Sequence, residues 1–200
     1  LFRRLSEKAD VVLENFTPGT MDRLGVGYET LKERNPGLIF CSISGFGQTG
    51  PYRDRPALDI VVQGMGGVLS ITGEKGGPPV RPGASYGDLT AGLYATIGIL
   101  SALHERDRSG LGQAIDLSML DCQVAVLENA YMRYSVTGKA PEPLGTRHPS
   151  ATPFQAFPTS DGYLVVALGF GEENHWSLFC GLLGLPELMD DARFGTSPRR

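Results

Sequence analysis

One carboxylate, that of Asp88, stands between a glycine-bearing loop and a long apolar segment of this 200-residue chain. A helix that begins here places Asp88 at its N-cap or in its first turn. The helix dipole and the unpaired amides of that turn favour an ionised carboxylate, which can act as a nucleophile. Gly87 and Gly92 leave room for a substrate to approach. An Asp at this position can equally be a simple cap, and its position alone leaves both roles open.

Other nucleophiles and metal ligands have weaker support in the sequence. There is no G-x-S-x-G elbow, and no pair among His104, His148 and His175 has the spacing of metal ligands, so no metal site is expected. The cysteines number three, are widely spaced and have apolar neighbours. This pattern indicates buried thiols in a reducing compartment rather than a disulfide framework.

Three short apolar runs, at 9–13, 38–44 and 113–118, are typical of strands, and helical patterns separate them. This alternation predicts an α/β fold with a parallel sheet. The first run ends at Asn15 and Phe16, where Thr17 is the expected N-cap of a helix and Pro18 its first residue. Ligands of α/β proteins bind at such junctions, so Asn15 and Phe16 are candidate site residues.

The clearest helix spans 88–106, with large apolar residues at helical spacing beside a stripe of small ones. Such a pattern predicts a helix packed tightly on another backbone. Further helices are expected at 58–72 and 119–137. After residue 140, two strands joined by an Asp-Gly turn predict a hairpin. We therefore expect a parallel-sheet domain at 1–139 and the start of a smaller α+β domain at 140–200.

The segment Gly45-Phe46-Gly47-Gln48-Thr49-Gly50 matches the dinucleotide fingerprint G-x-G-x-x-G and follows a strand. Pro51 and Pro56 follow it where the fingerprint requires a helix. The glycines are better explained by a wide loop that passes close to a ligand.

The net charge of −4 and the 20% content of charged residues give no basic surface for nucleic acid or an anionic membrane. No apolar run reaches the roughly 18 residues of a membrane-spanning helix. The first residue is Leu1, within a helical pattern, which suggests a fragment of a longer chain. We expect a cytoplasmic protein, with mitochondrial location left open.

A set of motifs in order along the chain resembles the family III CoA-transferases, the group of formyl-CoA and carnitine CoA-transferases. They are Glu14-Asn15-Phe16-Thr17-Pro18-Gly19, Arg23-Leu24-Gly25, Ser42-Ile43-Ser44-Gly45-Phe46-Gly47-Gln48-Thr49-Gly50-Pro51, Asp59 with Gln63, Gly87-Asp88, and Gly110-Leu111-Gly112-Gln113 with Asp116. The segments Gly145-Thr146-Arg147-His148 and Pro153-Phe154-Gln155-Ala156-Phe157 look similar to the dicarboxylate branch, which includes succinyl-CoA:glutarate transferases.

The resemblance implies a Rossmann-like CoA-binding domain, incomplete at its N-terminus, and an interlocked homodimer. It implies that Asp88 attacks an acyl-CoA thioester and that CoA reaches an acceptor acid through aspartyl mixed-anhydride and CoA-thioester intermediates. Asp59 matches an acidic residue close to the nucleophile. CoA and acyl-CoA are substrates, and no permanently bound cofactor is implied. The matching CoA contacts are Asn15, Phe16, Thr17, Arg23, Leu24, Arg55, Ala57 and Leu58.

The chain departs from the family pattern at two places. The glycine-run loop that covers the nucleophile in formyl-CoA transferase is replaced by Gly145-Thr146-Arg147-His148. We expect closure by residues 145–153, because an anhydride must be protected from water. Related racemases carry a His before the matching Asp, where this chain has Leu58, so racemisation is the weaker alternative. A non-catalytic CoA-binding module is a third hypothesis, and the 200 residues alone are expected to be poorly stable and inactive.

Overall fold

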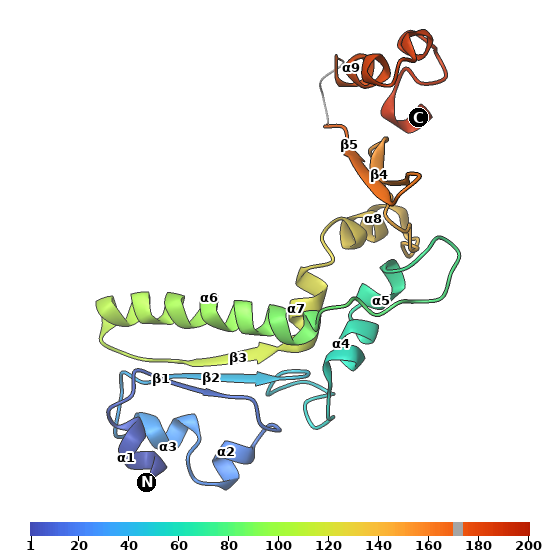
Figure 1. Ribbon diagram of the computed structural model, residues 1–200. Helices are drawn as coiled ribbons and strands as arrows, with labels where there is room; N and C mark the ends of the chain where they lie inside the picture. The colour runs from blue at the N-terminus through green and yellow to red at the C-terminus, as the bar shows by residue number, and fades with distance from the viewer. Residues whose placement is uncertain (170–173) are drawn as a thin grey trace. The chain divides into compact units, whose positions relative to one another are not determined.

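The computed structural model describes residues 1–169 and 174–200 (Figure 1). The chain forms two compact units. The first comprises Leu1–Thr72 and Pro79–Pro141, and the second comprises Gly73–Pro78 and Glu142–Arg200. Each unit is described by itself below.

The first unit contains a parallel sheet and eight of the described helices. Its elements are α1 (Phe2–Ser6), β1 (Val11–Glu14), α2 (Thr20–Arg23), α3 (Tyr28–Lys32), β2 (Ile39–Ser44), α4 (Asp59–Met65), α5 (Val68–Ile71), α6 (Tyr86–Ser109), β3 (Ala114–Ser118), α7 (Met119–Ala125) and α8 (Asn129–Thr137).

The sheet has the order β1-β2-β3, and both pairs are parallel, as the alternating pattern predicts. Val12 is paired with Phe40, and Ser44 with Ser118. Because the strands are parallel and in sequence order, their carboxyl ends meet at one edge of the sheet. The mixed α/β class predicted from the sequence is therefore confirmed for this unit.

Helices cover both faces of the sheet, as expected for buried parallel strands. Figure 1 shows α6 along one face and α1 to α3 on the opposite side. The core on the side of α2 and α3 is an apolar cluster with Val26 and Tyr28 packed against it. Its buried members are Val12, Met21, Leu31, Leu38 and Phe40.

Helix α6 contacts β2 and β3 through its small residues rather than through its large ones. Ala91, Ala95 and Ala102 are each only 2% exposed. A Cβ at Gly98 would lie 3.4 Å from Cγ2 of Ile115, so this helix approaches the sheet closely. The large stripe predicted to help bury the helix is instead exposed in this chain: Leu89, Leu93, Ile97 and Leu100.

Two helices predicted as continuous are broken. The segment 58–72 divides into α4 and α5 at Gly66 and Gly67, where Gly67 has φ of +92°. The segment 119–137 divides into α7 and α8 before Asn129, and Glu128 has φ of +47°. Positive φ is incompatible with a right-handed helix, so a continuous helix cannot pass through either residue, and each precedes the first residue of the next helix.

The expected cap at Thr17 is also wrong. Helix α2 begins at Thr20, and Gly19 is its N-cap with φ of +76°. A helix cannot continue through that left-handed residue, so Thr17 and Pro18 precede the helix in the turn after β1. The carbonyl of Thr17 accepts a hydrogen bond from the Thr20 amide at 3.1 Å, which closes the turn.

The second unit contains the predicted hairpin. Strands β4 (Phe154–Pro158) and β5 (Tyr163–Ala167) are antiparallel, and the turn between them is closed by the Thr159 amide, which donates to the Gly162 carbonyl at 2.8 Å. The remaining elements are α9 (Asn174–Leu182) and the 3-10 helices η1 (Pro186–Leu188) and η2 (Ser197–Arg199). The Trp176 indole packs near Phe179 and Phe194, with ring centroids 6.2 and 5.9 Å away.

Gly112 precedes β3 at a place with no room for a side chain. A Cβ there would lie 2.0 Å from the Leu38 carbonyl oxygen and 2.5 Å from the Gly37 carbonyl carbon. We predict that Gly112→Ala lowers the free energy of unfolding of the full-length protein by about 1–3 kcal/mol, because the backbone must separate. Gly92→Ala in α6 is the control, since its Cβ would meet nothing within 4 Å. A thermal midpoint of Gly112→Ala equal to that of Gly92→Ala would contradict this packing.

Candidate active site

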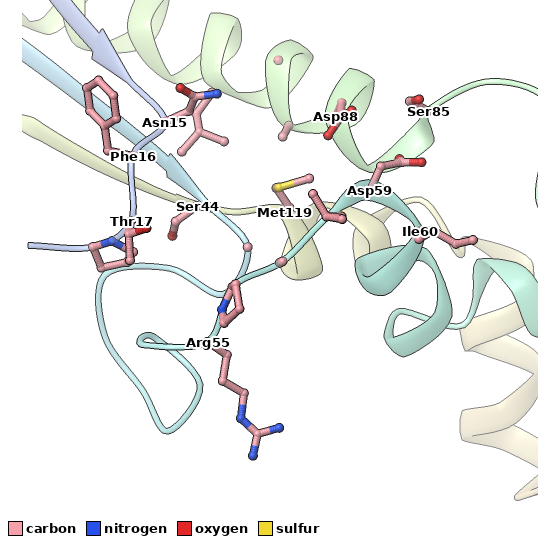
Figure 2. Close-up of a pocket in the computed structure, with 18 of the residues that line it drawn as sticks. Asn15, Phe16, Thr17, Ser44, Arg55, Asp59, Ile60, Ser85, Asp88 and Met119 are labelled. Carbon is pink, nitrogen blue, oxygen red and sulfur yellow. The ribbon is translucent and has the colours of Figure 1, made fainter. Parts of the chain in front are cut away.

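A cavity of about 690 Å³ opens at the carboxyl ends of the three parallel strands, within the first unit. Asn15 follows β1, Ser44 ends β2, and Met119 follows β3, and all of them line the cavity. Ligands of open α/β sheets bind at this edge because loops and helix N-termini converge there. Figure 2 shows these residues around the cavity together with Asp88 of α6 and Asp59 of α4.

Eight of the ten residues predicted for the site line this cavity. They are Asn15, Phe16, Thr17, Arg55, Ala57, Leu58, Asp59 and Asp88. Arg23 and Leu24 are absent from its lining as the structure describes it. Arg23 is exposed, and its guanidinium donates to the hydroxyl of Thr20 at 2.7 Å. Leu24 is 65% exposed.

Asp88 is the third residue of α6, in the predicted first turn, and it is exposed to the cavity. Ser85 is the N-cap of α6, and its side chain makes no capping hydrogen bond. Within the described part of the chain, no hydrogen bond or ion pair engages the Asp88 carboxylate. Asp88 therefore does not cap its own helix, and its carboxylate is available to a ligand.

The cap of α6 comes from another helix. Asp59 begins α4, and its Oδ1 accepts a hydrogen bond from the Gly87 amide at 2.8 Å. Its Oδ2 accepts from Nε2 of Gln63 at 2.7 Å and from Nη2 of Arg81 at 3.2 Å. The Asp59 side chain is only 12% exposed. A partly buried carboxylate with this many donors fixes the position of the backbone that carries Asp88.

The surroundings of Asp59 lower the pKa of its carboxyl group. Burial is the largest single influence and acts to raise the pKa, but four hydrogen bonds together outweigh it. Their donors are the side chains of Gln63 and Arg81 and the backbone amides of Gly87 and Asp88. The ionised form is thus the one that holds α6 in place.

The first turn of α6 is also stabilised by hydrogen bonds near the carbonyl groups of Tyr86 and Gly87. The hydroxyl of Thr90 donates to the Tyr86 carbonyl at 2.6 Å and lies 3.4 Å from the Gly87 carbonyl. Nε2 of the fully buried Gln123, from α7, donates to the same hydroxyl at 2.9 Å. A Cβ at Gly87 would lie 2.7 Å from Cγ2 of Val62, so only glycine lets α6 approach α4 this closely.

The loop after β2 forms another wall of the cavity. The Asp116 carboxylate of β3 accepts hydrogen bonds from the Gln48 amide at 2.9 and 3.0 Å. Gly47 and Gly50 have φ of +83° and +86°, and the next helix begins only at Asp59. The wide loop predicted here is therefore confirmed, and the context of a dinucleotide fingerprint is absent from this segment.

Several residues that line the cavity were not predicted from the sequence, and of these Arg81 and Ser85 matter most for the chemistry. Both lie in the loop before α6, and Nη2 of Arg81 donates to the Ser85 hydroxyl at 3.1 Å. The sequence contained one signal for Arg81, because it is a cation seven residues before the candidate nucleophile Asp88. Its contact with Asp59 could not be read from the sequence, because it depends on how the loop folds back on α4.

Other reactive groups do not compete with Asp88. Cys41, Cys122 and Cys180 are buried free thiols, as predicted, and burial together with the charge of Glu14 raises the pKa of Cys41 to about 11. Among residues 1–169 and 174–200, no group of three His, Cys, Asp or Glu side chains could hold a metal ion. No helix in those same ranges is long and apolar enough to cross a membrane.

Comparison with known proteins identifies the family. The model of CoA-transferase family III matches residues 1–200. The chain is 44% identical to the succinate–glutarate CoA-transferase of Agrobacterium fabrum, over the whole chain and 50% of that protein. It is 47% identical to the acetyl-CoA:oxalate CoA-transferase of Acetobacter aceti, over 97% of the chain and 50% of that protein.

Solved structures agree with this result. A CAIB/BAIF family protein from Brucella suis has a TM-score of 0.84 and 45% identity, over the whole chain and 52% of that structure. The chain belongs to CoA-transferase family III, as its motifs indicate. It spans about half the length of the curated relatives it matches.

The environment of Asp59 leads to a prediction about how the stability of the protein depends on pH. The folded-state pKa of Asp59 is lowered, so its ionised form stabilises the fold fully above the ordinary Asp value of 3.8. That stability is lost as pH falls through the lowered pKa. In the full-length protein, we expect Asp59→Asn to lower the thermal midpoint at pH 7 and to make the midpoint fall less steeply as the pH drops below the ordinary Asp value of 3.8.

Asp54→Asn is the matched control, because the Asp54 side chain is 84% exposed and its ion pair with Arg53 is 3.5 Å long. An Asp59→Asn variant whose thermal midpoint follows the wild-type and Asp54→Asn curves at every pH would refute the capping role.

Proposed function

We propose that the full-length protein transfers coenzyme A from an acyl-CoA donor to an acceptor carboxylic acid. One observation carries this proposal: the Asp88 carboxylate is unpaired in the described structure, and it faces a cavity while a second carboxylate, Asp59, holds its backbone. A residue that served only as a helix cap would have its oxygens on backbone amides. The family membership supports the same reaction class.

In the first proposed step, an Asp88 oxygen attacks the thioester carbonyl carbon of the donor. The carbon–sulfur bond breaks, and CoA leaves as a thiolate. The product is a mixed anhydride between the acyl group and Asp88. The dipole at the N-terminus of α6 stabilises negative charge on the attacking carboxylate, and Asp59 keeps that terminus in place through the Gly87 amide.

The later steps must return CoA to a different acid. The thiolate attacks the aspartyl carbonyl of the anhydride, which releases the donor acid and leaves CoA as a thioester of Asp88. The acceptor carboxylate then attacks that thioester, and a second mixed anhydride forms as the thiolate leaves. The thiolate finally attacks the acceptor acyl carbon, which yields the new acyl-CoA and restores Asp88. Every bond broken is matched by one formed, so no other reactant is needed.

We place CoA along the strand ends that lead to Asp88. Asn15, Phe16 and Thr17 extend from β1 on one side of the cavity, and Arg55 lies at its outer end (Figure 2). The Arg55 guanidinium stacks on the Tyr52 ring at 4.0 Å, which leaves its positive charge at the surface for the CoA phosphates. Arg23 stays a predicted contact of the same phosphates.

The names of relatives support a dicarboxylic substrate. Succinate and glutarate name the Agrobacterium enzyme, and oxalate names the Acetobacter enzyme. We propose succinyl-CoA as a donor for this protein. The homodimer and closure by residues 145–153 stay predictions from the family resemblance. The cytoplasmic location stays a prediction from the sequence.

Leu58 supports transfer over racemisation. It lines the cavity directly before Asp59 and is 72% exposed, so a base at this position would reach a bound thioester. Leucine cannot remove a proton, and the site therefore lacks the group that α-proton abstraction would require there.

Asp88→Asn should abolish transfer, because an amide is not a nucleophile under these conditions. We expect the rate of succinyl-CoA consumption with an acceptor acid to fall by at least about 10³-fold. Incubation of wild-type protein with succinyl-CoA and hydroxylamine should convert Asp88 to a hydroxamate, detected by peptide mass spectrometry.

Asp121→Asn is a suitable control, because Asp121 lies in the first turn of another helix, α7, outside the cavity lining. It should retain transfer and hydroxamate formation. Full turnover with an unlabelled Asp88 would exclude the anhydride, and exchange of the α-proton into deuterated water without an acceptor acid would favour racemisation instead.

A further inference from the structure

Arg81 has an unusual position at the cavity. It lies in the loop between α5 and α6, shortly before the helix that carries Asp88, and it lines the cavity with Asp59 and Asp88. Its Nη2 donates to Asp59 at 3.2 Å and to Ser85 at 3.1 Å. Its Nε and Nη1 have no hydrogen-bond partner among the described residues, and the side chain is 44% exposed. The guanidinium is therefore anchored at one nitrogen and open at the others.

The charges of the cavity make this arginine important for an anionic ligand. Two carboxylates, Asp59 and Asp88, line the inner end, and they repel a further carboxylate. The other arginine of the lining, Arg55, stacks on Tyr52, and Figure 2 shows its guanidinium pointing away from Asp88. Among the described lining residues, Arg81 is thus the one cation placed to offset this negative charge at the inner end.

We infer that Arg81 binds the free carboxylate of a dicarboxylic acyl group whose thioester carbonyl lies at Asp88. This inference rests on the proposed function and adds the feature that selects the substrate. A guanidinium is suited to the role because it stays charged and offers several donors to a carboxylate. Asp59 and Ser85 hold Arg81 by Nη2, so the open donors are already oriented when the substrate arrives.

A monocarboxylic acyl group has no carboxylate to place on Arg81. Loss of the Arg81 charge should therefore weaken the binding of dicarboxylic acyl-CoA substrates selectively. Loss of a group that only positions Asp88 should change the binding of every acyl-CoA to the same degree. A charge-assisted hydrogen bond contributes about 1.5–3 kcal/mol, which corresponds to an affinity change of about 10- to 150-fold.

The test measures binding in the full-length Asp88→Asn protein, so that no acyl transfer complicates the titration. Calorimetry would give the dissociation constants of succinyl-CoA, acetyl-CoA and CoA, with and without Arg81→Gln. We expect Arg81→Gln to raise the dissociation constant of succinyl-CoA by about 10- to 150-fold and to change those of acetyl-CoA and CoA by less than about threefold. Arg81→Lys should recover part of the lost affinity because it keeps the charge.

Two further variants make the result specific. Arg55→Gln should lower the affinity for all three ligands to a similar degree, since all of them carry the same CoA phosphates. Arg34→Gln should change the affinity for none of them, because Arg34 pairs with Glu7 at the C-cap of α1 and is outside the cavity.

If Arg81→Gln lowered the affinity for succinyl-CoA and acetyl-CoA equally, the inference would be overturned and Arg81 would be a positioning residue. Unchanged affinity for both ligands would also overturn the inference. If the loss were selective in this test but the wild-type protein transferred no CoA, the inference would stand and the proposed function would be rejected. If none of the three ligands bound to the Asp88→Asn protein, both would be rejected.

Discussion

The hydrogen bond from the Gly87 amide to the Asp59 carboxylate is the contact on which the site depends. Asp59 caps α6 from a neighbouring helix, so Asp88 of α6 is not needed as a cap. Gln63 and Arg81 hold the capping carboxylate, and the buried Gln123 holds Thr90 on the carbonyl side of the same turn. Asp88 is thus carried by a turn whose polar groups are satisfied by other residues.

This arrangement requires close approach between backbones, and small residues provide it. Gly87 lets α6 meet α4, and Ala91, Ala95 and Ala102 let the same helix lie on the sheet. The parallel order of β1, β2 and β3 then brings Asn15, Ser44 and Met119 to the edge where α6 begins. The Asp88 carboxylate and the lining residues from the strand ends meet there because the strands end together, although these residues are far apart in the sequence.

The two acidic residues of the site have the same chemistry but opposite environments. Asp59 is nearly buried and saturated with donors, which suits a residue that must remain ionised and fixed. Asp88 is exposed to the cavity and unpaired within the described structure, which leaves its oxygens open to a ligand. The resemblance placed both at the site, and the hydrogen bonds distinguish their structural roles.

The sequence by itself determined the parallel sheet, the hairpin, the buried thiols, the family and the first-turn position of Asp88, because these follow from local periodicity, turn residues and ordered motifs. It did not predict the breaks at Gly67 and Glu128, the exposed apolar stripe of α6, or the contact of Arg81 with Asp59. Only the tertiary structure decided which aspartate caps α6, because that choice depends on a hydrogen bond between residues 28 positions apart. Local propensity favours an Asp in the first turn as a cap, whereas helix packing supplied a better acceptor and left Asp88 open to the cavity.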